Sequence, residues 1–306
     1  MLRSEKRRRL LVAGAAAISL PPLLARAQSA ALVRKRIPSS AEEVPVIGLG
    51  TARRYEDAGS PDEAARRRET LARFAALGAS IVDTAPVYGE AEQVVGGIIA
   101  HLKLRERLFL ATKVSTGGGR AAGVQQIEGS FRRLHATTLD LVAVHNLRGT
   151  DVHLATLREL KQAGRIRYIG ITTSSERQYP DFEAVMRRER LDWIQVDYAL
   201  DNREAAGRIL PLAADRGMAV MINLPFGRGR LFSAVRGKPL PAWAAEFGAA
   251  SWPQFFLKYI VSHPAVTCAV PGMARPEYVE DNLGAARGPL PDASQRRRME
   301  TFIDSV

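Results

Sequence analysis

From Val46 onward, short apolar runs alternate with amphipathic stretches along the chain. The runs are rich in β-branched residues and stay apolar at successive positions, which is typical of strands buried on both faces. Eight strands are predicted on this basis, at residues 46–50, 80–85, 108–114, 139–145, 166–172, 193–198, 219–224 and 267–271.

Amphipathic helices are predicted between these strands, at residues 61–77, 91–102, 124–135, 152–163, 179–189, 203–216, 252–262 and 276–286, with a last helix at 292–303. Ser60-Pro61 marks the start of the first helix, and Gly78, Gly164 and Gly217 mark helix ends. Residues 36–40 are expected to form part of a small hairpin before the first strand. Eight strand–helix units match a (β/α)₈ TIM barrel of roughly 250 residues.

The predicted fold is therefore an α/β (β/α)₈ TIM barrel with a short N-terminal hairpin and an extra C-terminal helix. A doubly wound sheet is the rival fold. It usually carries a G-x-G-x-x-G turn after its first strand, and Gly48-Leu49-Gly50 is not followed by one.

The first 27 residues follow a different pattern. Lys6-Arg7-Arg8-Arg9 precedes an apolar run at 10–24, and Ala25-Arg26-Ala27 fits a small-x-small cleavage site. This order is typical of a bacterial secretory signal, and Arg7-Arg8 ahead of Leu10-Leu11 resembles a twin-arginine signal. We therefore expect the twin-arginine export machinery as a partner, a periplasmic location, no stable membrane anchor after cleavage, and one mature domain at 28–306. A cytosolic chain with a basic tail is the alternative.

Composition narrows the function classes. The chain has 306 residues, 46% of them hydrophobic, and a formal net charge of +12. A nucleic-acid partner must be considered at such a charge. Beyond residue 27, however, 38 Lys and Arg against 31 Asp and Glu leave +7. The remaining basic residues are scattered along the predicted helices, as in Arg66-Arg67-Arg68 and Arg296-Arg297-Arg298. This distribution favours solvated helix faces, and we expect no nucleic-acid partner.

The single cysteine, Cys268, excludes an internal disulfide and is expected on a buried strand. No metal site is predicted.

Polar residues stand where three consecutive strands end. The second strand runs into Asp83, with Tyr88 five residues later; the third ends with Lys113 and the fourth with His145. Each residue alone has an ordinary structural explanation. Together they lie where the chemistry of a TIM barrel is found, at the carboxyl ends of its strands.

This set resembles the catalytic tetrad of the aldo-keto reductases. The segment from Arg36 to Gly50-Thr51 is similar to the opening of that family, and Asp83-Thr84-Ala85-Pro86-Val87-Tyr88-Gly89 is similar to its signature. The resemblance implies an NAD(P)H-dependent oxidoreductase that interconverts aldehydes or ketones and alcohols. It also implies roles: Tyr88 as general acid, Lys113 as its cationic neighbour, Asp83 as the group that orients Lys113, and His145 as the residue that positions the carbonyl oxygen.

The physical chemistry agrees with these roles. Reduction of a carbonyl leaves negative charge on oxygen, so a proton must reach that atom. Moving the pKa of a tyrosine from ~10 to ~7 takes roughly 4 kcal/mol. One cation ~4 Å away at an effective dielectric of ~20 supplies about that much. Lys113 is therefore expected to lower the pKa of Tyr88, and His145 to add a donor aimed at the oxyanion.

The resemblance also implies a cofactor site along the later strands. Gln195 corresponds to the ligand of the nicotinamide carboxamide, and Tyr198 to the ring on which the nicotinamide stacks. The pyrophosphate loop corresponds to Pro225, Phe226, Gly227, Gly229 and Arg230, with Arg228 inside it. The adenosine-phosphate segment runs from Gly272 and Arg275 to Asp281 and Asn282. Gly50, Thr51, Asp83, Thr172 and Thr173 complete the predicted cofactor contacts.

Two departures from the family bear on cofactor choice. Thr172-Thr173 stands where a Ser-Asn pair is common in the family, so the side-chain amide of the Asn is absent from this chain. Gly272 and Tyr278 replace a Lys and an Arg that often bind the 2′-phosphate. Arg275 is predicted to replace them, because one guanidinium can grip a phosphate. NADPH is therefore the expected cofactor, with NADH as the alternative.

Two other functions stay open at this point: a nucleotide-binding sensor or regulatory subunit of the same fold with little turnover, and a basic nucleic-acid binder, which would show salt-dependent binding. The sequence does not identify the substrate. Tyr55, Trp243 and Phe247 either line a substrate pocket or pack against other residues of the protein.

Overall fold

The computed structural model describes residues 31–306, and the export signal predicted at residues 1–27 lies outside the described residues. Leu32–Val306 form one compact unit. In it, eight parallel strands pair in the order β10-β9-β8-β7-β6-β5-β4-β3. Parallel bridges from Ile47 to Ala269 and from Gly50 to Gly272 join the first and last of them. The predicted TIM barrel and its strand order along the chain are confirmed.

The barrel strands are short and follow the predicted apolar runs closely. Their bounds are β3 Leu49–Gly50, β4 Ile81–Asp83, β5 Phe109–Val114, β6 Leu139–His145, β7 Ile166–Thr172, β8 Trp193–Asp197, β9 Ala219–Asn223 and β10 Cys268–Ala269. Cys268 is a buried free thiol on the last of these strands, as predicted.

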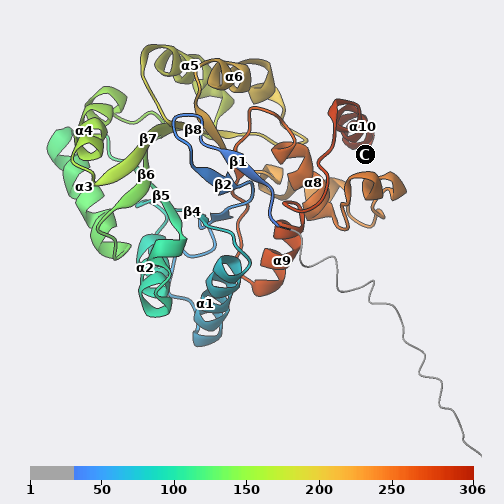
Figure 1. Ribbon diagram of the computed structural model, residues 1–306, viewed down its shortest axis with the longest axis horizontal. Coiled ribbons are helices and arrows are strands. Elements are labelled where there is room, and N and C mark those ends of the chain that lie inside the picture. Colours follow the sequence, from blue (N-terminus) through green and yellow to red (C-terminus); the bar gives the residue numbers. More distant parts are fainter. Residues whose placement is uncertain (1–30) are drawn as a thin grey trace, which may run out of the picture. The chain divides into compact units, whose positions relative to one another are not determined.

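The helices form a ring around the strands (Figure 1). They are α1 Pro61–Ala76, α2 Ala91–Leu102, α3 Arg120–Arg133, α4 Thr150–Gln162, α5 Tyr179–Arg188, α6 Glu204–Asp215, α7 Arg230–Ala234, α8 Trp252–Val261, α9 Pro276–Gly284 and α10 Ala293–Asp304. The short α7 was not predicted, and α3 begins four residues before its predicted start, at 120 instead of 124.

Local sequence signals explain several helix ends. Ser60 caps α1 in a capping box with Glu63, and Asp292 caps α10 in the same way with Gln295. Gly164 and Gly217, which follow α4 and α6, adopt φ of +69° and +64°. Glycine tolerates this left-handed region best, so both positions end their helices as predicted.

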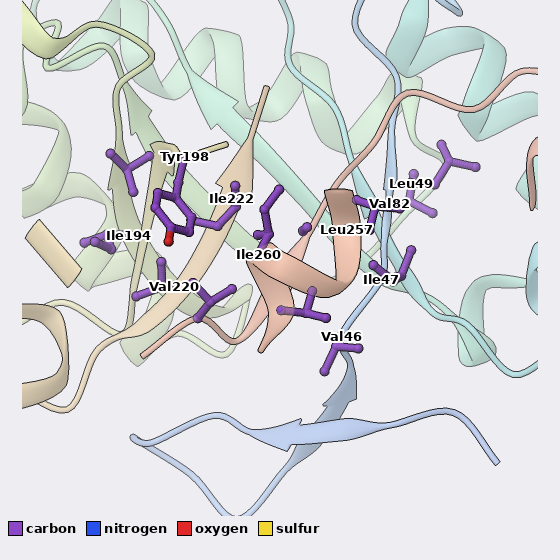
Figure 2. Packing of buried hydrophobic residues seen from close by; sticks show 14 of the residues in the cluster. Val46, Ile47, Leu49, Val82, Ile194, Tyr198, Val220, Ile222, Leu257 and Ile260 are labelled. Atoms are coloured by element: carbon purple, nitrogen blue, oxygen red, sulfur yellow. The ribbon is translucent and has the colours of Figure 1, made fainter. Parts of the chain in front are cut away.

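Two apolar layers explain why the strands are apolar at every position. Inside the barrel, side chains such as Phe109, Trp193 and Met221 pack against one another. Outside it, the alternate strand side chains pack against the helices. Figure 2 shows this outer layer, with Val220 and Ile222 of β9 beside Ile260 of α8.

The N-terminal hairpin pairs β1 Arg34–Arg36 with β2 Glu43–Pro45. Ile37, in its turn, belongs to the interior cluster, and the Ser40 and Tyr168 hydroxyls lie 2.9 Å apart. Lys35 Nζ donates to three backbone carbonyls ahead of β10, those of Val261, His263 and Val266. The hairpin thus covers the amino ends of the strands and leaves the carboxyl ends open.

Basic runs on α1 and α10 are only partly solvated. Arg67 is buried and donates to the carbonyl and carboxylate of Asp57. Arg296 donates to the hydroxyls of Tyr198 and Ser262. The expectation that these arginines all lie on solvated faces is therefore wrong for one member of each triplet, because the 3.6-residue period turns it inward.

Among the described residues, none of the helices has the length and apolar character needed to cross a membrane.

Candidate active site

A cavity of about 500 Å³ opens at the carboxyl ends of the barrel strands. It gathers predicted residues that are distant in the sequence. The predicted site residues that line it are Gly50, Thr51, Asp83, Tyr88, His145, Thr172, Gln195, Pro225, Phe226, Gly229 and Gly272. The parallel topology causes this, because every strand ends at the same mouth.

Lys113 lies beneath the cavity wall and is almost completely buried. Its Nζ lies 2.8 Å from Asp83 Oδ1 and 2.8 Å from the carbonyl oxygen of Thr84. The same nitrogen is 5.2 Å from the centroid of the Tyr88 ring. The structure thus brings Asp83, Tyr88 and Lys113 together as the sequence predicted. Burial lowers the pKa of Lys113, but the carboxylate of Asp83 and the phenol of Tyr88 raise it by more than that. The pKa of Lys113 is therefore above its ordinary value, and the ammonium stays charged.

The pKa of Tyr88 is raised above its ordinary value. Burial is the main cause; Lys113 opposes it, and Asp83 and Glu56 add to it. The predicted lowering of this pKa is therefore wrong for this arrangement, because burial outweighs the effect of the Lys113 charge, which Asp83 also partly neutralises at 2.8 Å. At neutral pH the phenol keeps its proton.

His145 completes the set from the end of β6. Its ring meets the Tyr88 ring edge to face, with centroids 5.9 Å apart and an interplanar angle of 83°. Burial, with help from the cations Lys113 and Arg148, lowers the pKa of His145 to about 3. The imidazole is therefore neutral at physiological pH, and its Nδ1 lies 2.5 Å from Ser115 Oγ.

Two amides face the cavity from the later strands. Gln195 Oε1 accepts from Thr172 Oγ1 at 3.0 Å, while its Nε2 is 3.0 Å from the thioether of Met221, a weak acceptor. Asn223 Nδ2 donates to the Thr173 carbonyl at 2.9 Å. Its Oδ1 is buried and has no partner among the described residues. Buried polar atoms are rarely left unpaired, so this acceptor fits a ligand donor.

Tyr198 does not reach the cavity. Its ring is fully buried in the outer layer, where it stacks on Tyr259 at 5.7 Å. Its hydroxyl donates to Tyr259 and accepts from Arg296. Figure 2 shows it in the same apolar layer as Ile222 and Ile260. The prediction that the nicotinamide stacks on Tyr198 is therefore wrong, because Tyr198 is three positions from Gln195 and faces the opposite side of the strand.

Several other predicted cofactor residues lie outside the cavity lining. Thr173 Oγ1 donates to Gln178 Oε1 at 2.7 Å. Arg230 Nε lies 2.9 Å from Asp201 Oδ2, and a Cβ on Gly227 would lie 2.5 Å from the same oxygen. Gly227 therefore has to be glycine for this pair to form. Arg275 is half-exposed near Glu277, with 3.9 Å between the charged atoms.

The two last predicted residues belong to α9. Asp281 accepts from Ser251 and Gln254 at 2.6 and 3.0 Å, and Asn282 is buried beside it.

The cavity also contains residues that the sequence analysis missed. These include Ala52, Arg53, Arg54, Glu56, Asn146, Ser174, Asn223, Leu224, Phe232 and Val270, while Arg228 of the predicted pyrophosphate loop also lines the cavity. Most are immediate neighbours of predicted residues. By contrast, Tyr55, Trp243 and Phe247 do not line the cavity. Tyr55 is buried against Arg67, and the other two pack with Phe255.

A larger hollow of about 880 Å³ lies at the amino ends of β8 and β9. Its carboxylates are paired with its cations, as in Lys161 with Asp192 at 2.6 Å. The four residues of the predicted tetrad lie at the opposite end of the barrel, at or beside the smaller cavity.

The chain belongs to the aldo/keto reductase family, whose model matches residues 46–301. It is thus an oxidoreductase of that family, as the resemblance implied. The methylglyoxal reductase YeaE of Escherichia coli is 29% identical over 260 residues, which cover 82% of this chain and 88% of that protein. The aldo-keto reductase YhdN of Bacillus subtilis is 32% identical over 177 residues, about half of each chain at 53%.

Solved structures agree on the fold. An aldo/keto reductase from Klebsiella pneumoniae, solved in complex with NADP and acetate, has a TM-score of 0.74 and 25% sequence identity. The match covers 90% of this chain and 95% of that one.

Proposed function

We propose that this protein is an NADPH-dependent reductase of small aldehydes or ketones, with Tyr88 as the proton donor. The observation that carries the proposal is the buried ammonium of Lys113, held by Asp83 at 2.8 Å beside the ring of Tyr88. A lysine and a carboxylate almost completely removed from water are a costly arrangement, which is common where a reaction needs them.

The residues around the cavity fit a nicotinamide dinucleotide. Gln195 Nε2 has only a thioether as a described acceptor, and Asn223 Oδ1 is an unpartnered buried acceptor. These two amide atoms, with Thr172, suit the donor and acceptor of a carboxamide. The loop from Pro225 through Arg228 to Gly229 suits the pyrophosphate, because Arg228 adds a guanidinium to the cavity lining there. When bound, NADPH supplies the hydride.

The protein's own groups then handle the proton and the charge on oxygen. The phenol of Tyr88 is protonated at neutral pH and donates its proton to the carbonyl oxygen. Lys113 stabilises the resulting phenolate, because a buried ammonium interacts strongly with a new negative charge. Asp83 keeps Lys113 charged and in place. His145, which is neutral, contributes an N–H to the same oxygen.

The substrate proposal follows from the relatives. YeaE is named a methylglyoxal reductase, so methylglyoxal is the first substrate to assay, followed by larger aldehydes and ketones. The test compares oxidation of NADPH by wild-type protein and by Tyr88→Phe. We expect turnover by the wild type, loss of nearly all of it in Tyr88→Phe, and equal NADPH affinity in the two.

A matched control is Tyr168→Phe, because Tyr168 lies at the closed end of the barrel and bonds to Glu42 and Ser40. It should keep its rate. Wild-type protein that binds NADPH but reduces none of the carbonyls would favour the nucleotide sensor. Near-wild-type turnover by Tyr88→Phe would remove Tyr88 from the mechanism.

The export proposal stands on the sequence of residues 1–27 alone. We propose periplasmic delivery through the twin-arginine pathway, which moves folded proteins and so suits an enzyme that binds its cofactor before export. Replacing Arg7, Arg8 and Arg9 together by Lys keeps the charge and removes the pair. We expect this variant to stay in the cytoplasm uncleaved, while Arg34→Lys/Arg36→Lys is exported. A wild-type chain found intact in the cytoplasm would contradict the proposal.

A further inference from the structure

Ser115 is a buried residue of the site that the proposed mechanism leaves without a role. It follows the end of β5, two positions after Lys113, and strand side chains two apart share a face. Its Oγ lies 2.5 Å from His145 Nδ1. One strand end therefore presents two contacts to the tetrad, Lys113 to Asp83 and Ser115 to His145.

We propose that Ser115 is a positioning residue that donates its hydroxyl proton to Nδ1 of His145 and so holds the imidazole in the tautomer that carries its proton on Nε2. The proposal deepens the function above and rests on it for the role of His145. It concerns which of the two ring nitrogens offers a hydrogen-bond donor to the substrate oxygen.

A neutral imidazole has a single N–H, so one nitrogen donates and the other accepts. Here the ring is neutral because burial and two nearby cations lower its pKa to about 3. With Nδ1 facing Ser115 and the ring at the cavity wall, Nε2 is the nitrogen left for the substrate. It can stabilise an oxyanion only as a donor. The opposite tautomer would present a lone pair to the developing negative charge.

The surroundings of Ser115 favour donation by its hydroxyl. Among residues 31–306, His145 Nδ1 is the only hydrogen-bond partner of Ser115 Oγ. An Nδ1–H donating to Oγ would leave the serine proton without an acceptor at a nearly inaccessible position, which is unfavourable. The backbone N–H of Ser115 donates to Gln126 Oε1 at 2.6 Å, so α3 fixes the residue that aims the hydroxyl.

The direct test is the tautomer itself, read from the ¹⁵N shifts of the two ring nitrogens in protein labelled at histidine. The chain has five histidines, and His145→Gln identifies the signals that belong to His145. We expect wild-type His145 to show a protonated Nε2 and an unprotonated Nδ1. In Ser115→Ala the shifts should move toward a mixture of tautomers, and in Ser115→Thr they should stay as in the wild type.

Kinetics supply a second readout. Ser115→Ala should lower kcat for carbonyl reduction about tenfold, less than the roughly 100- to 1000-fold lost when an oxyanion donor is removed outright. The dissociation constant of NADPH should not change, and Ser115→Thr should recover most of kcat. Thr116→Ala is the matched control, because the Thr116 hydroxyl accepts from Gly118 and does not touch the ring.

Two results would overturn the inference: a wild-type His145 protonated on Nδ1, or a Ser115→Ala tautomer unchanged from the wild type. The tautomer can be measured without turnover, so a wild-type protein that reduces no carbonyl would count against the proposed function and leave this assignment to be decided by the spectrum.

Discussion

Lys113 and Asp83 form an ion pair at 2.8 Å in which both side chains are at least nine-tenths buried. The lysine comes from β5 and the aspartate from the end of the adjacent strand β4. A buried pair of this kind adds little net stability, because the desolvation of both charges offsets their attraction. Its position beside Tyr88 agrees with the catalytic role that we propose for it.

Breaking this ion pair should lower both the stability and the activity of the protein, and a second substitution should recover the stability alone. Lys113→Met leaves the Asp83 carboxylate buried without its cation, and we expect the free energy of unfolding to fall by about 3–5 kcal/mol. Adding Asp83→Asn removes the stranded charge and should recover most of that loss, while turnover stays absent. Urea denaturation and NADPH oxidation measure the two effects.

The exposed pair of Arg120 and Glu159 is the control for that experiment. Arg120→Met should change the unfolding free energy little, because exposed ion pairs contribute little. A double variant as unstable as Lys113→Met alone would contradict the explanation from an uncompensated charge.

The pH dependence of reduction should follow from the pKa values of Tyr88 and His145. The Tyr88 pKa is raised above 10.0, so the acid form persists through neutral pH and is lost only as pH rises above 10. The His145 pKa is lowered to about 3, so its neutral form persists as pH falls well below 6.5. We expect kcat/KM to be flat between pH 5 and 9 apart from general instability. A titration of the wild-type kcat/KM near pH 7 would refute this assignment.

The barrel could be predicted because its strands are apolar on both faces and its helices carry clear caps and glycine stops. The ends of β4, β5 and β6 could be predicted for the same reason, since a polar residue that closes a buried run must lie at the mouth. The site roles of these residues came from the resemblance, because an isolated Asp, Lys or His has many structural uses.

The alternation of side chains along a strand could have shown that Tyr198 does not face the cofactor site. Gln195 and Asp197 share one face of β8, and Tyr198, three residues from Gln195, has to lie on the other. Ser115 could have been found in the same way, as the residue two positions after Lys113. Arg53 and Arg54 could not, because they reach the cavity through a loop in which Arg53 adopts a φ of +59°, and no sequence period describes a loop.

Arg54 changes the prediction of which arginine binds a cofactor phosphate. A Cβ on Gly272 would lie 3.3 Å from Arg54 Cγ and 3.4 Å from its Nε, so the Arg54 side chain covers the cavity wall there. Arg275 lies outside the cavity lining, near Glu277 and over the ring of Tyr278. We expect Arg54→Ala to weaken NADPH binding about tenfold or more, since a charge-assisted hydrogen bond contributes roughly 1.5–3 kcal/mol. Arg275→Ala should have a smaller effect.

Fluorescence titration with NADPH and with NADH shows whether Arg54 binds the 2′-phosphate or the pyrophosphate of the cofactor. Weaker binding of NADPH alone places Arg54 at the 2′-phosphate, and weaker binding of both places it at the pyrophosphate. Unchanged affinity for both cofactors would exclude Arg54 from either role. Tighter binding of NADH than NADPH by the wild type would overturn the choice of cofactor.

Two adjacent glycines of α2 should respond in opposite ways to alanine. A Cβ on Gly96 would lie 2.0 Å from the carbonyl oxygen of Arg133, so α2 and the end of α3 meet through this position. We expect Gly96→Ala to lower the unfolding free energy by about 1–3 kcal/mol, because neither backbone can yield without disturbing the packing. Gly97 is exposed and a Cβ there would meet no atom within 4 Å. Gly97→Ala should therefore stabilise the protein by about 0.4–1 kcal/mol through reduced freedom of the unfolded chain. Denaturant midpoints measure both, and a Gly96→Ala protein as stable as Gly97→Ala would show that the helices do not approach as closely as this contact requires.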